Sequence, residues 1–427
     1  MVHLDCENSS SPTSEGEKRS RLLTYSLYAF GFLDLFAVAL LVPNITRHAT
    51  QLGGSPTYVG LSGSIYGTLQ LLSSPLVGRW SDVSGRRRSL LICLFFTSLG
   101  YILMGVAPSI FYYLLARIPL GICKHSVSIT KAILTQSTPK EERAKTLGYF
   151  NGFSSMGFII GPLVGGHLAE LENGFFIVTV ATSSIFAFCF LVVLLFLRDH
   201  HCRGNSLPTS DSVKNFMQDD FSADFRNSLQ TFRNIVRSGP ELFFMRFLQG
   251  LSATLFRSNF MLILEQKFQT TPAENGRIIS FGSIASAGCA LGVGHLVRLY
   301  GDVPRLYLHA NVLRVVALVG LVFVPNIYIF MAFYFLLSMT SASARVCITN
   351  LSIERGKVED TGAMLGLAQS LMSVCRTVSP LVAGVTQEVS VSGPIILSFV
   401  VSLGNTALVA VTDLRQKQRL SEDKKNP

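Results

Sequence analysis

Apolar segments about 20 residues long recur along this chain, and short polar segments rich in charge separate them. A helix needs roughly 20 apolar residues to cross a bilayer, so each segment is predicted to span the lipid bilayer. Boundaries read from a pattern shift by a few residues. We predict twelve spans, at residues 22–44, 57–79, 89–107, 111–136, 145–167, 174–197, 241–264, 275–298, 306–324, 327–350, 362–386 and 393–411.

The polar segments divide the chain into parts. Residues 198–240 carry charges of both signs and no apolar periodicity, so they are predicted to form a cytoplasmic linker between two six-helix bundles. The bundles are then residues 21–197 and 241–411. Residues 1–20 are predicted to be a disordered cytosolic tail, and residues 412–427 a second cytosolic tail.

A charged hinge, Gly78–Arg88, lies between the second and third predicted spans and holds four arginines. Cytoplasmic loops of membrane proteins carry the excess of Lys and Arg. With both termini inside and span ends counted with the loops, 25 of the 36 basic residues are cytoplasmic, against three outside (Arg47, Lys267 and Arg277). We therefore predict that both termini are cytoplasmic.

The two halves repeat each other. A weaker copy of the hinge recurs in the second half as Gly294–Gly301. At nearly the same offset, Leu147-Gly148 followed by Pro162–Gly166 recurs as Leu365-Gly366 followed by Pro380–Gly384, with the same spacing from Gly to Pro. Parallel six-helix repeats are typical of secondary carriers, in which one half rocks against the other.

Composition supports a membrane protein and excludes several other classes. The chain is 49% hydrophobic and only 15% charged, with a mean hydropathy of +0.42; soluble domains carry about 25% charged residues. The net charge of +10 is spread between apolar runs, so we expect no nucleic-acid partner. The eight cysteines show no metal or disulfide spacing, no Walker loop for ATP is present, and no cofactor or enzymatic activity is predicted.

Several motifs resemble those of the major facilitator superfamily, in particular the tetracycline-resistance-like drug/proton antiporters. Leu33-Asp34 resembles their first helix, and Arg117 with Gly121 their fourth. Val83 replaces a usual basic residue of the hinge, and Gln136 a frequent Asp. The positions that match the hinge signature and the fifth-helix signature are Gly78, Asp82, Gly85, Arg86 and Arg87, and Gly148, Gly157, Gly161, Pro162 and Gly165.

This resemblance implies an all-α, twelve-helix carrier that works by alternating access and is coupled to protons. Its substrate would be a small organic solute, and the monomer would be the functional unit. An uncoupled facilitator and a non-transporting sensor or scaffold on the same fold remain alternatives. The sequence does not decide between the plasma membrane and an endolysosomal membrane.

Asp34 is the sharpest candidate for mechanism. It lies about 18 Å along its helix from Leu22, near the middle of the bilayer, where a charge costs about 2.5–3.5 kcal/mol on insertion scales. By resemblance it would be the proton-coupling residue, with Arg117 as its partner cation. A structural ion pair or a helix-capping role is the plainer interpretation.

The predicted fourth span holds Arg117, Lys124 and Lys131 at intervals of seven, which on one regular helix would share a face with Ser128. A cationic stripe is expected to line a water-filled cavity. Alternatively, Arg117 and Lys131 extend to opposite membrane surfaces and leave only Lys124 central.

Arg257, Arg345 and Arg376 are the substrate-cavity candidates of the second half, while Arg246 and Arg314 are predicted to extend to the cytoplasmic surface. An interior rich in cations and poor in carboxylates favours an organic anion or a zwitterion as substrate, and we favour the anion. Antiporters of the resembling branch often handle neutral or cationic compounds, so that class stays open.

Gating residues are predicted at the hinge and in the fifth span. By resemblance, Asp82 would contact the start of the eleventh helix near Thr361, and the fifth helix would lie between the halves. Gly157, Gly161 and Gly165 permit close helix packing, and Pro162 permits a bend. A solvated Asp82 and ordinary packing of the glycines are the alternatives.

Overall fold

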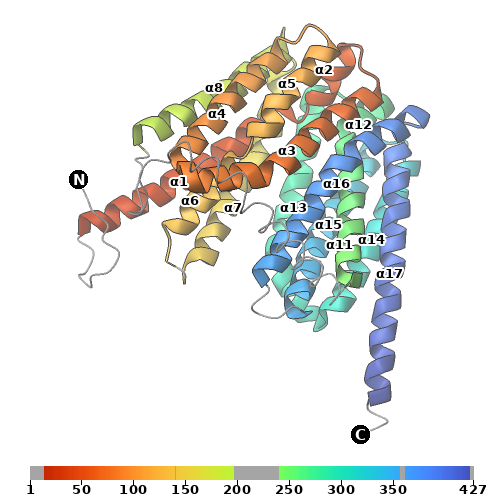
Figure 1. Ribbon diagram of the computed structural model, residues 1–427. Coiled ribbons are helices and arrows are strands. Elements are labelled where there is room, and N and C mark those ends of the chain that lie inside the picture. The colour runs from red at the N-terminus through yellow and green to blue at the C-terminus, as the bar shows by residue number, and fades with distance from the viewer. Residues whose placement is uncertain (1–13, 140, 197–239, 356–360, 424–427) are drawn as a thin grey trace.

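The computed structural model describes residues 14–139, 141–196, 240–355 and 361–423 (Figure 1). Within these ranges the regular structure is helical. The first half contains α1 (Ser14–Leu41), α2 (Ile45–Gln51), α3 (Pro56–Ser84), α4 (Arg86–Gly105), α5 (Ile110–Cys123), α6 (Ser126–Gln136), α7 (Arg143–Leu168) and α8 (Gly174–Phe196). The second contains α11 (Pro240–Ser258), α12 (Phe260–Phe268), α13 (Pro272–Tyr300), α14 (Val303–Phe323), α15 (Ile327–Arg355), α16 (Thr361–Val389) and α17 (Gly393–Asp423).

The helices of the described ranges follow the predicted spans, with two spans broken in two. The fourth span is α5 with α6 and the seventh is α11 with α12, whereas the first span is covered by α1 and the short helix α2 follows it. Seven stretches of described residues are long and apolar enough to cross a membrane. Large apolar side chains on the outer surfaces, such as Leu291, Phe323 and Leu195, are 89, 79 and 70% exposed, as expected of surfaces that face lipid.

Two predicted boundaries change. α1 begins at Ser14, within the segment expected to be disordered, and α17 continues to Asp423, through most of the expected C-terminal tail. Lys, Arg, Gln and Glu are good helix formers, so a spanning helix can continue through them into water. The predicted linker lies outside the described residues except for Pro240.

The hinge and its copy both turn at a glycine. Gly85 has φ +95° between α3 and α4, and Gly301 has φ +63° between α13 and α14. Residues other than glycine rarely adopt positive φ angles of this size. The repeated glycine therefore has a conformational reason in each half.

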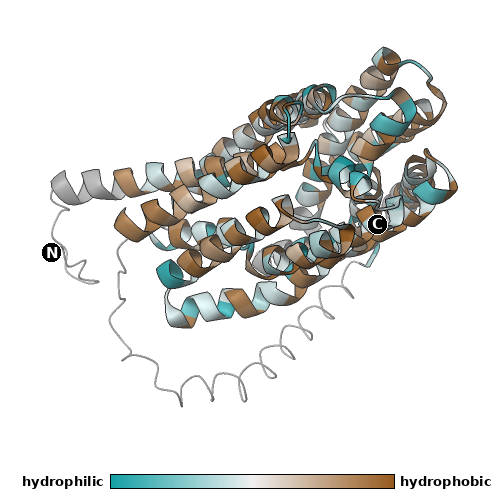
Figure 2. Cartoon of the chain, turned by 90° about the horizontal axis from the view of Figure 1, so that it is seen from above, coloured by the Kyte–Doolittle hydropathy of each residue, from teal (hydrophilic) through white to brown (hydrophobic). Residues whose placement is uncertain are grey.

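The chain forms two helical bundles with separate hydrophobic cores. One core gathers residues between Leu27 and Val193, and the others lie in the second half. The bundles come together near α2 and α12 and spread apart toward the opposite ends (Figure 1). Hydrophobic residues cover most of the helix lengths, and hydrophilic residues gather mainly near helix ends and turns (Figure 2).

The bundles join through two equivalent crossings, α3 with α16 and α7 with α13. A Cβ on Gly60 would collide with the carbonyl oxygen of Pro380, and one on Gly276 would collide with that of Pro162. Gly60 and Gly276 occupy matching positions of the two repeats, as do Pro162 and Pro380. These contacts lie at the outer ends of the spans by the predicted orientation, so the two halves are closed outside and parted inside.

Candidate functional site

Asp34 forms a buried ion pair with Lys124. Its Oδ1 and Oδ2 lie 2.5 and 2.8 Å from the Lys124 Nζ, and the Ser126 hydroxyl donates a further hydrogen bond to Oδ2. Asp34 is 0% exposed and Lys124 is 8% exposed. Each charge is thus compensated within the first bundle, which a buried charge requires.

A break in the fourth span makes this arrangement possible. α5 ends at Cys123 and α6 begins at Ser126, and Lys124 leaves the helical conformation with ψ +63°. On an unbroken helix two residues two positions apart point about 200° apart, so Lys124 and Ser126 could not both reach Asp34. The Gln70 side chain donates to the Lys124 carbonyl at 3.1 Å and satisfies part of the opened backbone.

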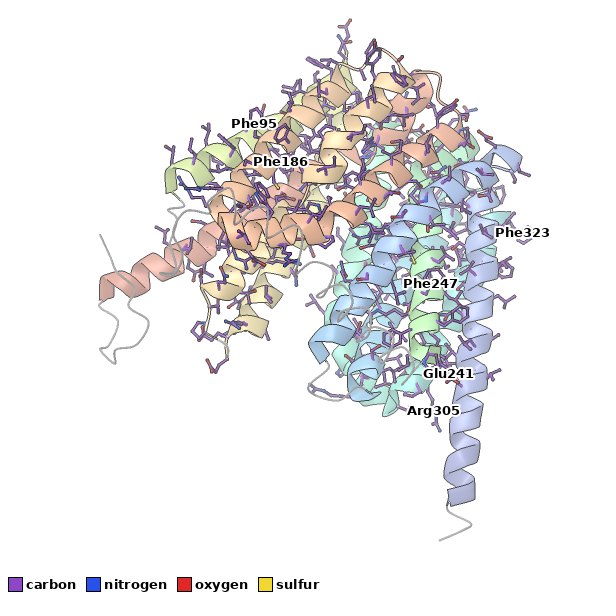
Figure 3. The ribbon with its side chains drawn as sticks, viewed as in Figure 1. Phe95, Phe186, Glu241, Phe247, Arg305 and Phe323 are labelled. Atoms are coloured by element: carbon purple, nitrogen blue, oxygen red, sulfur yellow. The ribbon has the colours of Figure 1, made fainter. Side chains whose placement is uncertain are left out.

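The break overturns the predicted cationic stripe. Lys124 was expected to line a water-filled cavity, but its ammonium is buried against Asp34 and lies 4.7 Å from the centre of the Phe186 ring. Phe186 lies on α8 within the first bundle (Figure 3). The seven-residue spacing assumed one continuous helix, and here it is interrupted.

Arg117 is not the partner of Asp34. Its Nε donates to Ser62 Oγ at 3.0 Å and its Nη2 to the Tyr113 hydroxyl at 2.8 Å, and the side chain is buried. Lys124 occupies the position beside Asp34 that was predicted for Arg117, because the helix break turns Lys124 inward. A role of Arg117 in proton coupling stays a prediction.

The arginines of the second half are arranged differently. Arg257, Arg345 and Arg376 are exposed, and none forms an ion pair with a carboxylate among the described residues. Arg345 donates to Ser286 Oγ at 3.1 Å, and the Arg257 guanidinium lies 6.0 Å from the ring of Phe158 in the first bundle. Arg257 therefore faces the opposite bundle.

Arg376 and Ser128 are also exposed. A Cβ on Gly67 of α3 would lie 2.8 Å from the carbonyl oxygen of Arg376, so this arginine sits where α16 crosses the first bundle. Ser128 is exposed on α6. Both positions suit the predicted cavity, although their contact with a substrate stays a prediction.

Arg314 does not extend to the cytoplasmic surface as predicted. It is 2% exposed, and its Nη2 donates to Ser252 Oγ at 3.0 Å and contacts the Gln249 carbonyl at 3.5 Å. The residue lies eleven positions after the start of α14, about 16 Å along it, too deep for the side chain to reach water. The sequence held a signal for a polar partner of Arg314 inside the second bundle. Ser252, which accepts the hydrogen bond from Arg314, occupies in the second repeat the position that Asp34 occupies in the first.

The hinge connects helices of the first bundle. Asp82 Oδ1 accepts from Arg86 Nη2 at 2.7 Å, and the same arginine donates through Nε to Gln136 at 2.8 Å. Arg87 donates to the Leu194 carbonyl at 2.8 Å. A Cβ on Gly78 would meet nothing within 4 Å among the described residues. The expected contact of Asp82 with the start of α16 stays a prediction for a state closed on the inside.

The predicted gating residues of α7 contact two different helices, α1 and α13. A Cβ on Gly157 would lie 2.5 Å from the Phe32 carbonyl, and Gly161 and Gly165 likewise meet α1. Pro162 instead faces Gly276 of the second bundle. The three glycines thus pack α7 within its own bundle, whereas Pro162 lies at the closure between the halves.

Two glutamates at the closure were not singled out from the sequence. Glu388, at the end of α16, accepts from Ser55 Oγ at 2.5 Å and from the Thr57 backbone at 3.3 Å, at the start of α3. Glu170, after α7, accepts from the Ala273 backbone at 3.4 Å, at the start of α13. The glutamates occupy matching positions of the two repeats, so the duplication could have revealed them.

Comparison with known proteins identifies relatives along the whole chain. The family described as "Major Facilitator Superfamily" matches twice, over residues 27–241 and 242–426. Human major facilitator superfamily domain-containing protein 10 is 27% identical over 364 residues, covering 83% of this chain and 77% of that protein. The class E tetracycline resistance protein of Escherichia coli is 25% identical, covering 64% of this chain and 65% of that protein.

Solved structures of transporters share the fold. An inward-facing, unoccupied bacterial homologue of the human lysosomal transporter Spinster has a TM-score of 0.70 at 15% identity, covering 92% of this chain and 94% of that one. The human organic anion transporter MFSD10 (TETRAN) has a TM-score of 0.59 at 20% identity, with coverage of 91% and 99%.

Proposed function

This chain belongs to the Major Facilitator Superfamily and is a multi-pass membrane transporter rather than an enzyme, and we propose that it moves a small organic solute by proton-coupled alternating access. Two bundles that touch at one end and part at the other are the arrangement that alternating access requires. The predicted alternatives, an uncoupled facilitator and a non-transporting scaffold, are the outcomes against which the proposal is tested.

The Asp34–Lys124 pair is the observation that supports proton coupling. Protonation of Asp34 would leave the Lys124 ammonium buried without its counter-charge, and an uncompensated buried charge is costly. The first bundle would then favour a conformation in which Lys124 is hydrated or meets another anion. A proton that changes the relative free energies of two conformations is a coupling ion.

Asp34→Asn tests the coupling in liposomes containing the purified protein. Radiolabelled para-aminohippurate and tetraethylammonium serve as anionic and cationic probes within a wider solute screen. We expect the variant to lose uptake driven by a pH gradient while counterflow exchange continues, because exchange needs no net proton movement. Asp302→Asn, which removes a carboxylate near the surface, is the matched control.

Each alternative gives a different result in the same assay. An uncoupled facilitator predicts wild-type uptake that does not respond to the pH gradient. A scaffold predicts no flux of any solute in the screen. Unchanged pH-driven uptake in Asp34→Asn would show that Asp34 is not the coupling residue.

The preferred substrate class of this proposal is the organic anion. Exposed Arg257, Arg345 and Arg376 carry positive charge without carboxylate partners among the described residues, and the human relative MFSD10 is described as an organic anion transporter. Lys124 no longer contributes to the charge argument, since Asp34 neutralises it. The anion preference therefore depends on the second bundle.

Arg345→Ala and Arg376→Ala should each reduce uptake of para-aminohippurate more than uptake of tetraethylammonium. Arg305→Ala, which breaks a surface ion pair with Asp302, controls for the loss of a positive charge. Equal losses for both probes would remove the argument for an anionic substrate and leave the transport proposal intact.

A further inference from the structure

A cavity in the first bundle extends from the hinge to His125, the residue that follows Lys124. It has a volume of about 290 Å³ and lies between α3 and α6. At the hinge end it is bounded by Asp82, whose side chain is 59% exposed, and by Arg86. Ser81, His125 and Ala132 also line it.

The cavity is suited to water. A volume of about 10–15 Å³ available to its centre is enough for one molecule, so several fit here. Ser81 is 1% exposed and lines the cavity, and its Oγ has no hydrogen-bond partner in the described part of the chain. A buried hydroxyl without a protein partner normally bonds to water.

His125 connects this cavity to the ion pair. It lines the cavity, it is 6% exposed, and it follows Lys124 directly at the break between α5 and α6. The other titratable residues of the lining, Asp82 and Arg86, are paired with each other at the hinge. His125 is therefore the titratable group of the lining that lies next to Lys124 along the chain, and Lys124 is the residue paired with Asp34.

The hydrogen bonding of His125 fits proton transfer. Its Nε2 lies 2.8 Å from Ser73 Oγ, and the same Oγ lies 3.3 Å from the Gly121 carbonyl. A hydroxyl can accept from the ring or donate to it, so Ser73 can accompany either tautomer. Imidazole has two ring nitrogens, so in general it can bind a proton at one and release a proton from the other. Besides Lys124 on its own segment, the charged groups around this path are Asp34 on α1 and Asp82 and Arg86 at the hinge.

We propose that His125 relays protons between the cytoplasm-facing cavity and the Asp34–Lys124 pair. This inference rests on the proposed proton coupling. In each transfer the imidazole binds one proton from cavity water and releases one toward the Asp34 carboxylate, which becomes the neutral acid. The reverse sequence returns the proton to the cytoplasm. Without such a relay, a pair that is sealed from solvent would exchange protons slowly.

Infrared spectroscopy of the purified protein tests the relay without a transported substrate. After a rapid drop in pH, the carbonyl stretch of protonated Asp34 should appear in the wild type and be absent from Asp34→Asn. In His125→Gln we expect the same final amplitude, reached more slowly by about tenfold or more. His295→Gln, an exposed histidine of α13, is the matched control and should keep the wild-type rate.

The possible results are distinguishable. A wild-type rate in His125→Gln would overturn the relay and leave the coupling role of Asp34 standing. A changed final amplitude would indicate that His125 only shapes the site. Absence of an Asp34 signal in the wild type would overturn the coupling proposal itself.

A second variant tests the route if His125→Gln does not fold. Ala132→Cys places a thiol in the cavity, and a membrane-impermeant, bulky thiol reagent added to the cytoplasmic side should label it. Labelling should slow the protonation of Asp34 by a similar factor. No labelling, or labelling without any slowing, would show that protons do not enter through this cavity.

Discussion

The two bundles are equivalent where they close against each other and different where they bury charge. At the closure, each half supplies a glycine, a proline carbonyl and a glutamate at matching positions. In the interior, Asp34 of the first half corresponds to Ser252 of the second. Each half buries an arginine against neutral groups, Arg117 in the first and Arg314 in the second, but among the described residues only the first half also buries a compensated ion pair.

This difference indicates a division of labour that duplication alone would not produce. Under the proposed alternating access, a closure that opens by rocking needs similar contacts on both sides of the axis. Under the proposed coupling, one proton-binding site is sufficient, and a carboxylate in both halves would add a second buried charge. The equivalence and the difference can each be tested separately.

The largest expected effect on the free energy of unfolding comes from breaking the Asp34–Lys124 ion pair. Lys124→Met should lower the free energy of unfolding by about 3–5 kcal/mol, because it leaves the Asp34 carboxylate buried without a partner. The double variant Asp34→Asn with Lys124→Met should recover most of this loss. Thermal unfolding in one detergent measures both, and no recovery in the double variant would contradict the pairing.

Arg314→Met should cost less, at about 1 kcal/mol, since it leaves no charge behind. Ser252 keeps its hydrogen bond to Ser398 at 2.9 Å in this variant. The same unfolding assay applies. A loss as large as that of Lys124→Met would mean that the second half holds a compensating charge too, and the contrast between the halves would fail.

At the closure, Gly60→Ala and Gly276→Ala should have equal effects. Each added methyl group would collide with a proline carbonyl of the other bundle and push the outer ends apart. Distances between spin labels on the outer ends of α3 and α16 should then shift toward a population open on the outside. Gly288→Ala, where a Cβ would meet no described atom within 4 Å, is the control. Unequal shifts of the two variants would contradict the equivalence of the two crossings.

The smallest effect concerns the glutamates. Hydrogen bonds from Thr271 to Glu170, and from Ser55 and Thr57 to Glu388, lower the pKa of each carboxyl below its ordinary value. A lowered pKa means that the ionised form stabilises the closure. This contribution is complete above the ordinary glutamate pKa of about 4.3 and is lost as the pH falls through the lower value.

Acidification of the outer side should therefore loosen the closure only below about pH 4.3. Glu170→Gln and Glu388→Gln should each weaken it slightly at neutral pH and reduce the response to acid. The same spin-label distances report the change. A response centred near neutral pH would point to a group other than these glutamates.

Much of the fold could be predicted from the sequence because it depends on local patterns and on the repeat. The spans, the turn glycines and the duplication needed only residue type and spacing, and the family matches over both halves confirm the resemblance. Asp34 could be singled out for the same reason, since a carboxylate in the middle of an apolar helix is conspicuous by composition alone.

The partner of Asp34 could not be obtained in this way. It depends on the break at Lys124, whose local sequence also suits a continuous helix, and on packing that brings α1 beside α6. Arg314 likewise appeared able to reach water until its depth inside the second bundle was known. The sequence thus determined which charges enter the membrane, and the tertiary structure decided which of them are compensated, because pairing depends on distances between helices far apart in the chain.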